Sequence, residues 1–262
     1  MVNKERLDEL YEKFNQQKYL SPDPLEVVAR YEDPRDKEVV AFIAAMLAYG
    51  RVASIVKNVD KVLRELGEHP AEFLVGDKGR FLDRGLEGFK HRWTTREEVQ
   101  AMLIALRAML RLHGSLEAGF AEGVRSFDES IIPAMATWTR ALDRRNCRSL
   151  ISKPEKGSAC KRLHMFMRWM VRKDEIDLGL WTQVKPEQLI VPLDTHMFRV
   201  CKAMGMTLRK QPNYLAAKDI TEAFKRISPE DPVKYDFALT RLGIRKDESM
   251  RQFLLEQHIL KR

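Results

Sequence analysis

The sequence predicts an all-α protein, and three observations support this fold class. Apolar residues recur at the helical spacing i, i+3, i+4, i+7 in one segment after another, beginning with Leu7, Leu10, Tyr11 and Phe14. Runs of alternating polar and apolar residues, which are typical of strands, are few. The usual β-hairpin dipeptides, Asn-Gly and Asp-Gly, do not occur.

Most of the expected helices are bounded by residues that favour a helix start or end. Asp33-Pro34 opens the second helix, and Thr95 with Glu98 three residues later forms a capping box for the fourth. Gly67, Gly114 and Gly205 each follow a helical segment and end it. In chain order the expected helices span about 7–14, 34–48, 53–66, 95–112, 128–142, 158–172, 194–204, 217–227 and 232–242, followed by a short charged helix in the tail.

Composition indicates a globular protein with a core of its own. The 262 residues are 44% hydrophobic and 32% charged, and the longest apolar run, twelve residues from Val39 to Gly50, is too short to span a bilayer. The charged stretch Asn3–Arg6 does not fit a secretory signal. Three cysteines cannot all pair and form no C-x-x-C motif, which argues against a disulfide scaffold or a cysteine zinc site. We therefore expect a cytoplasmic protein.

The positive charge is unevenly distributed along the chain. Residues 151–262 carry the entire net charge of +8, and the stretch 140–162 has eight basic residues against two acidic ones. A cluster of this kind favours a polyanion, because bound cations release counterions from phosphates. The alternative is an ordinary solvated surface.

Two segments carry the features that indicate chemistry. The first is Gly157-Ser158-Ala159-Cys160-Lys161, and the second is the run from Val191 to Val200, which contains Asp194 and His196. A glycine-led turn before a helix exposes backbone N–H groups at the helix N-terminus, where they can bind a phosphate. The neighbouring Lys156 and Arg162 would then hold adjacent phosphates.

These segments resemble the signatures of the helix-hairpin-helix (HhH-GPD) DNA glycosylases of the endonuclease III and 8-oxoguanine glycosylase type. The family's hairpin reads Leu-Pro-Gly-Val-Gly-x-Lys-Thr-Ala, of which Gly157 and Lys161 match the first glycine and the lysine. Its second signature, Val-Asp-Thr-His-Val-x-Arg-Val, matches the run from Leu193 to Val200 almost position by position.

The chain also departs from the family pattern. Ala159 replaces the second hairpin glycine, and Asp194 follows Lys161 by 33 positions, a spacing closer to that of the archaeal 8-oxoguanine glycosylase branch. No cysteine occurs in 202–262, so we expect no iron–sulfur cluster and no other cofactor or metal.

The resemblance implies a two-lobed helical fold with a central cleft. The whole chain, 1–262, would form one unit, with lobe A at about 36–172, including the hairpin at 152–161, and lobe B at about 1–35 plus 190–262. It also implies a monomeric base excision repair enzyme without membrane attachment, located in the cytoplasm at the nucleoid. Its substrate would be double-stranded DNA containing a damaged base, an oxidised purine by the spacing resemblance, or an abasic site.

The resemblance assigns catalysis to Lys161 and Asp194. Lys161 would attack C1′ of the sugar of a flipped nucleotide and form a Schiff base, for which its amine must be neutral. Burial and neighbouring cations favour the neutral amine. Asp194 would stay ionised, assist deprotonation and stabilise positive charge on the sugar. The alternatives are a solvated surface lysine, an aspartate that only caps a helix, and, for His196, a structural histidine rather than a phosphate contact.

Other residues are candidates for contact with the base or the duplex. Their aromatic rings suit stacking and their charges suit phosphates, although such clusters often only pack a loop. These candidates are Tyr49, Arg51, Phe89, His91, Trp93 and Trp181.

Two other functions remain open at this point. One is a helix-hairpin-helix protein that binds DNA without chemistry, which Ala159 and the insertion at 173–188 favour mildly. The other is a helix-turn-helix regulator, for which neither a recognition helix nor a dimer interface is evident. The presence of both Lys161 and Asp194 favours the enzyme, because binding alone requires neither.

Overall fold

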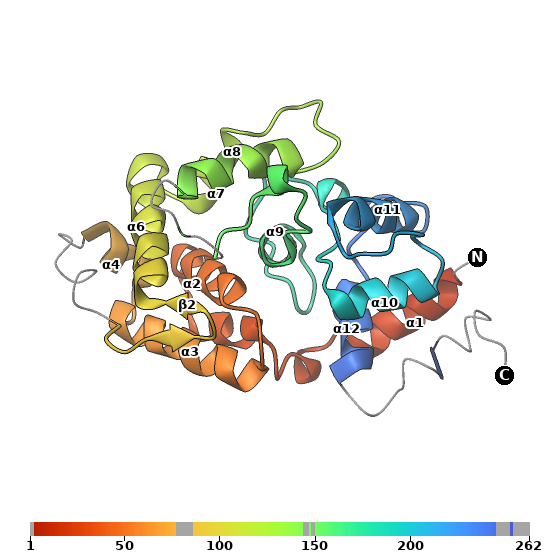
Figure 1. The fold of residues 1–262 in the computed structure, drawn as a ribbon, viewed down its shortest axis with the longest axis horizontal. Helices are drawn as coiled ribbons and strands as arrows, with labels where there is room; N and C mark the ends of the chain where they lie inside the picture. The colour runs from red at the N-terminus through yellow and green to blue at the C-terminus, as the bar shows by residue number, and fades with distance from the viewer. Residues whose placement is uncertain (1–2, 77–85, 144–146, 148–149, 245–251, 254–262) are drawn as a thin grey trace. The chain divides into compact units, whose positions relative to one another are not determined.

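The structure is a computed structural model that describes residues 3–76, 86–143, 147, 150–244 and 252–253. It is mostly helical, so the predicted all-α class is confirmed (Figure 1). In the described part of the chain, no helix has the length and apolar character needed to cross a membrane. The expected tail helix and residues 144–146 and 148–149 of the basic stretch lie outside the described residues.

The chain divides into two compact units. Unit 1 comprises residues 1–19, 154–179 and 185–262, and unit 2 comprises 20–153 and 180–184. These boundaries differ from the expected lobes: the hairpin and the helix after it belong with the two ends of the chain, whereas 20–35 belong with the middle. The helix after the hairpin belongs to unit 1 because its buried arginines pair with carboxylates that come later in the chain.

Unit 2 is organised around one buried helix. Its helices are α2 (Pro34–Met46), α3 (Val52–Leu66), α4 (Pro70–Gly76), α6 (Arg96–His113), α7 (Leu116–Ala121) and α8 (Ile132–Leu142), with the 3₁₀ segment η2 (Pro24–Arg30). Residues 39–47 of α2 and its C-terminal cap have no solvent exposure, as expected for a helix that is apolar on every side. η2, α3 and α4 all pack against α2.

Local sequence signals account for several boundaries in unit 2. The predicted capping box at the start of α6 is present, and Glu98 Oε2 accepts a hydrogen bond from Thr95 N at 2.9 Å. Gly67 ends α3 with a φ of +74°, which favours glycine. The helix expected at about 128–142 is α8, which begins at Ile132 and not near Asp128, because Pro133 occupies its first turn, where proline is favoured.

Unit 2 also contains a small hairpin that the sequence did not predict. Strands β1 (Lys90–His91) and β2 (Thr94–Thr95) pair antiparallel, with Arg92 and Trp93 forming the turn. Arg92 has a φ of +55°, a conformation usually taken by glycine or asparagine in such turns. The turn residues Arg92 and Trp93 do not form one of the dipeptides that predict a β-hairpin, so the sequence carried no indication of this turn.

Unit 1 gathers helices from both ends of the chain. Its helices are α1 (Lys4–Phe14), α9 (Lys161–Val171), α10 (Thr195–Ala203), α11 (Tyr214–Lys225) and α12 (Asp236–Ile244), with the 3₁₀ segments η1 (Gln17–Tyr19), η4 (Pro154–Lys156) and η5 (Pro186–Gln188). α12 packs against both α1 and α10. The two segments with glycosylase-like signatures, at η4–α9 and at the start of α10, thus belong to the same unit.

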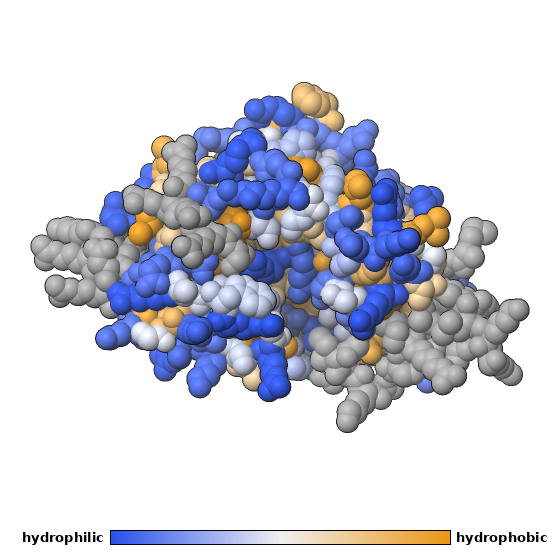
Figure 2. All heavy atoms as spheres, viewed as in Figure 1, coloured by the Kyte–Doolittle hydropathy of each residue, from blue (hydrophilic) through white to orange (hydrophobic). Residues whose placement is uncertain are grey.

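The surface seen in Figure 2 is largely hydrophilic. Apolar residues appear there as small separate spots among charged and polar ones. Scattered spots of this kind are normal for a protein surface.

Candidate functional site

Lys161 and Asp194 lie side by side in unit 1. Lys161 is the first residue of α9 and Asp194 is the N-cap of α10, and the distance from Lys161 Nζ to Asp194 Oδ2 is 3.8 Å. Their side chains are 32% and 39% exposed, so both are accessible from solvent although the larger part of each is buried. The fold thus brings together two residues that are 33 positions apart in the sequence.

The two oxygens of Asp194 have different roles. Oδ1 accepts a hydrogen bond from Met197 N at 2.8 Å, which caps α10, while Oδ2 is the oxygen near the Lys161 amine. The capping bond fixes the carboxylate in one orientation. Capping and contact with the lysine are therefore compatible.

The hairpin before α9 is tightly turned. Gly157 has a φ of +71°, and its carbonyl accepts a hydrogen bond from Tyr214 N at 3.1 Å, which ties the hairpin to the start of α11. Ser158 Oγ accepts a hydrogen bond from Cys160 N at 3.2 Å. Cys160 is the N-cap residue, in the left-handed conformation and without a side-chain capping bond.

The N-cap residue Cys160 therefore makes no side-chain capping bond at the N-terminus of α9, beside which Lys161 stands. The first-turn N–H groups of a helix have no partner within the helix, so they are suited to an anion. Lys156, Gly157 and Ser158 are exposed, Arg162 is half-buried, and Ala159 and Cys160 are buried. Burial raises the pKa of the Cys160 thiol to about 11, so the thiol stays protonated at neutral pH.

Beyond Arg162, the basic side chains of α9 and its C-terminal cap are buried. Lys161, His164, Arg168 and Arg172 recur at spacings of three and four, but of these four only Lys161 is exposed to any extent. Arg168 Nε donates to Asp177 Oδ1 at 3.1 Å, and Arg168 Nη1 pairs with Asp236 Oδ2. These arginines hold the helix in unit 1 and are not free to bind phosphate.

Arg172 completes this buried network. Its Nε donates to Asp231 Oδ2 at 2.9 Å and its Nη1 to Asp174 Oδ2 at 2.8 Å, and Nη1 also pairs with Asp177. Burial raises the pKa of Asp177 to about 6, against the opposing effect of the two guanidinium groups. Removing one member of such a network leaves a buried charge without compensation, at a cost of about 3–5 kcal/mol.

Asp236 connects the network to the Lys161–Asp194 pair. Burial raises its pKa, Arg168 opposes that shift, and the charges of Asp194 and Lys161 act on it in opposite directions. Asp236 therefore lies within electrostatic reach of both candidate catalytic residues. Sequence reasoning missed this residue, since a single aspartate at a helix start looks like an ordinary surface residue.

His196 lies on the first turn of α10, two residues beyond Asp194. It is half-buried, and its Nε2 is buried without a hydrogen-bond partner among the described residues. A buried ring nitrogen without a partner carries a desolvation penalty. Because this atom is also shielded from solvent, a ligand group would have to displace neighbouring atoms to reach it.

The candidate base-contacting residues belong to unit 2, and four of them form one cluster. The Tyr49 and Trp93 rings are stacked, with centroids 5.3 Å apart and an interplanar angle of 15°, and the Tyr49 hydroxyl donates to the His91 carbonyl at 3.0 Å. The Arg92 guanidinium lies 4.5 Å from the centre of the Trp93 ring. Trp93 is 59% exposed, which is unusual for tryptophan, and Phe89, directly before the hairpin in sequence, is buried.

The remaining members of this set differ in accessibility. His91 is buried, with Nδ1 3.1 Å from Asn58 Nδ2 and Nε2 3.0 Å from the Tyr49 carbonyl, so both ring nitrogens are occupied by the fold. Arg51 is exposed at the N-cap of α3. Tyr49, Arg51 and Trp93 are thus accessible, whereas His91 serves to hold the hairpin.

Trp181 has a structural environment. It is 3% exposed, and its Nε1 donates to Glu38 Oε1 at 2.6 Å. Glu38 also accepts from Leu116 N and Glu117 N, both at 2.8 Å, and burial raises its pKa. The Trp181 ring packs edge-on against Trp138 in the core of unit 2, which leaves no exposed face for a base.

Within the described residues, no group of three histidine, cysteine or acidic side chains is arranged to hold a metal ion. The chemistry that the site offers from its own residues is that of an amine beside a fixed carboxylate.

Comparison with known proteins places this all-α chain in a family. A family profile described as "Protein of unknown function (DUF2400)" matches residues 23–245, which is most of the chain, so the protein belongs to that family. No curated protein and no solved structure matches it. The match covers both units and includes Lys161 and Asp194.

Proposed function

We propose that this protein is a DNA repair glycosylase with abasic-site lyase activity, acting through a Schiff base on Lys161. The observation that carries the proposal is the approach of Lys161 Nζ to Asp194 Oδ2, at 3.8 Å, at the adjoining starts of two helices. The resemblance of both segments to the glycosylase signatures supports it. Cys160, the N-cap residue of α9, makes no side-chain capping bond beside the lysine, which suits an anion at this helix N-terminus.

The chemistry follows from this pair. The neutral Lys161 amine attacks C1′ of the target nucleotide, the bond from C1′ to the base breaks, and the base leaves with the bonding electrons and takes up a proton. Asp194 Oδ2 stabilises the positive charge that develops on the sugar and accepts a proton from the attacking nitrogen. Opening of the sugar ring then gives the Schiff base, from which the strand can be cleaved.

The DNA backbone would bind at the hairpin. The exposed residues Gly157 and Ser158 and the first turn of α9 offer N–H groups to a phosphate, with Lys156 and Arg162 nearby in sequence. A contact of His196 Nε2 with a second phosphate or the sugar would require the ring to become exposed when DNA binds, because the atom is buried in the free protein. Ala159 and Cys160 are buried, so only their backbone would contribute.

Tyr49, Arg51 and Trp93 would contact the bases of the duplex. Exposed aromatic rings stack on unpaired bases, and the adjacent Arg92 adds positive charge for phosphates. His91 and Phe89 would act through the hairpin that they support. We leave Trp181 out of this set because its ring is buried.

The alternative function is DNA binding without chemistry. The short distance between Lys161 and Asp194 also fits an ion pair that only stabilises the site, which favours this alternative. A cleavage assay separates the two: duplexes containing 8-oxoguanine or an abasic site are incubated with wild type, Lys161→Gln and Asp194→Asn. If the protein is a glycosylase, only wild type should cleave the strand. Unchanged DNA affinity in all three proteins, with no cleavage by any of them, would instead support DNA binding without chemistry.

A further inference from the structure

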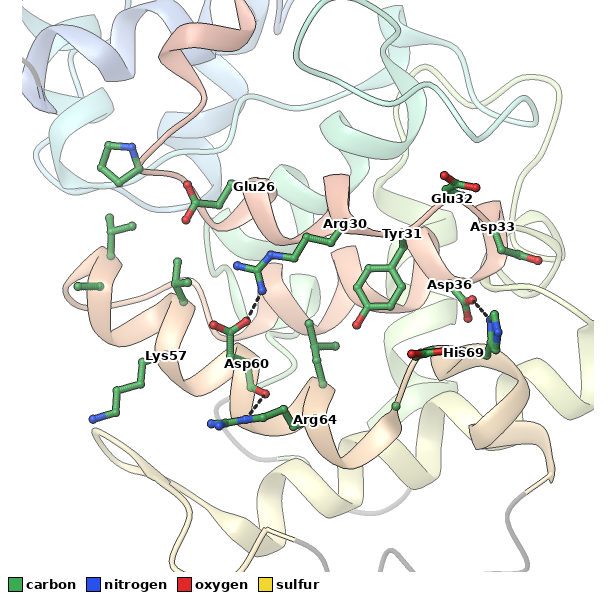
Figure 3. A pocket seen from close by; sticks show the side chains of 17 residues that line it. Glu26, Arg30, Tyr31, Glu32, Asp33, Asp36, Lys57, Asp60, Arg64 and His69 are labelled. Carbon is green, nitrogen blue, oxygen red and sulfur yellow. Dashed lines mark hydrogen bonds and ion pairs between the residues drawn. The ribbon is translucent and has the colours of Figure 1, made fainter.

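A groove with a volume of about 1400 Å³ lies in unit 2, along one side of α3 (Figure 3). Its walls come from η2 and the chain up to Asp36 on one side and from α3 on the other, and residues 67–69 close one end. Its volume exceeds the roughly 300–1,000 Å³ that is usual for small-molecule sites. A larger, elongated occupant therefore suits it better.

The α3 wall offers a continuous helix face. Val52, Val56, Asp60 and Leu63, at spacings of three and four, all line the groove, and residues 52 to 64 extend along it for about 18 Å at 1.5 Å per residue. Val52 and Val56 are half-exposed, so the α3 wall is apolar at the N-terminal end of this helix and open to a ligand there. That length matches about three turns of a helix.

The charges along the groove are asymmetric. In the middle, Arg30 Nη1 pairs with Asp60 Oδ1 at 2.7 Å, and Arg64 Nε donates to the Asp60 carbonyl at 3.3 Å, which leaves this part without excess negative charge. Beyond Tyr31 the lining is acidic, with Glu32 and Asp33 exposed beside the buried Asp36, as Figure 3 shows.

The acidic end is partly neutralised, because Arg35 Nε lies 3.6 Å from Asp33 Oδ1. Asp36 is 3.4 Å from His69 Nδ1 and accepts from Ala71 N at 2.8 Å, while Glu68 adds a further exposed carboxylate. The Tyr31 hydroxyl points into the groove, and burial, together with the charge of Asp36, raises its pKa. An acidic surface on a chain of net charge +8 repels nucleic acid and attracts cations.

We infer that this groove binds an amphipathic, basic segment of a partner protein. Apolar side chains of the segment would lie over Val52, Ala53 and Val56, and its lysines or arginines would face Glu32, Asp33 and Glu68. Amphipathic helices commonly bind apolar grooves in this way, and charge complementarity fixes their direction. This inference does not depend on the chemistry proposed for Lys161.

The test is a binding titration with a defined probe. The probe is a fluorescein-labelled peptide of about 15 residues with a leucine stripe at helical spacing and lysines over its last two turns, compared with the same peptide carrying glutamates in place of lysines. We expect Glu32→Gln combined with Glu68→Gln, and separately Val56→Asp, to weaken binding of the lysine peptide at least about tenfold. The matched controls Glu129→Gln and Val75→Asp, at exposed positions outside the groove, should stay within about twofold.

A photo-crosslinker at Ala53 should capture the lysine peptide in wild type. Absence of saturable binding, equal binding by the groove variants, or equal affinity for the glutamate peptide would overturn the inference. Sedimentation of the protein without peptide tests a second copy of the chain as the occupant. A dimer that Val56→Asp dissociates would assign the groove to self-association and not to a partner.

Discussion

His164 lies one turn after Lys161 on α9 and is completely buried, and neither of its ring nitrogens has a hydrogen-bond partner among the described residues. Burial lowers the pKa of this imidazole from its ordinary 6.5 to about 3. The folded protein therefore holds His164 neutral at pH values where the unfolded chain binds a proton. This difference makes the free energy of unfolding depend on pH.

The sign follows from proton linkage. The contribution of neutral His164 is present in full above pH 6.5 and is lost progressively as the pH falls toward 3, because protons then favour the unfolded chain. At about 1.4 kcal/mol per pH unit, the loss at pH 5 is about 2 kcal/mol, and it approaches about 5 kcal/mol near pH 3. Asp177, whose pKa burial raises to about 6, acts in the opposite direction over part of this range.

The variant His164→Phe removes the titrating group at similar volume, and the buried carboxylates remain. We expect urea unfolding, followed by circular dichroism at pH 7 and pH 5, to show a fall in unfolding free energy about 2 kcal/mol larger for wild type than for the variant. His69→Gln, at an exposed position, should behave as wild type within about 0.5 kcal/mol. Identical pH dependence in His164→Phe and wild type would refute the assignment of a neutral buried imidazole.

Three further predictions concern other parts of the structure. Arg172→Met leaves Asp177 and its neighbours without compensation, so we expect the unfolding free energy to fall by about 3–5 kcal/mol in chemical denaturation, whereas Arg199→Met, at an exposed position, should change it little. Glu38→Gln turns an amide N–H toward groups that are themselves donors, so it should cost about 1–3 kcal/mol and shift the tryptophan emission; an unchanged protein would argue against the bonds to Glu38. Asp194→Asn keeps the cap but removes the charge, so stability should stay within about 0.5 kcal/mol while strand cleavage falls roughly 100-fold or more; equal losses in both would reduce Asp194 to a cap.

Much of the fold could be predicted because its signals are local. The capping box at Thr95 and Glu98 and the glycine after Leu66 fixed helix ends through residues only a few positions apart. The short helices α4 and α7 were missed because six or seven residues are too few to show a helical period.

The candidate site could be predicted only in part, for the same reason. Lys161 and Asp194 stand within short signatures, whereas the residues that surround α9 come from distant positions. Arg168 is paired with Asp236, 68 residues later, and no local pattern distinguishes a buried arginine from a solvated one. Ion pairs of this kind join α9 to the C-terminal segments, so the observed units differ from the lobes that the sequence predicted.

The measurement that tests the central claim most directly is borohydride trapping on two duplexes, one with an abasic site and one with 8-oxoguanine. Wild type should form a covalent protein–DNA adduct that Lys161→Gln abolishes, and peptide mapping should place the attachment on Lys161. An adduct that persists in Lys161→Gln would contradict the assignment of the nucleophile. No adduct on either duplex, with salt-dependent DNA binding intact, would contradict the Schiff-base chemistry itself.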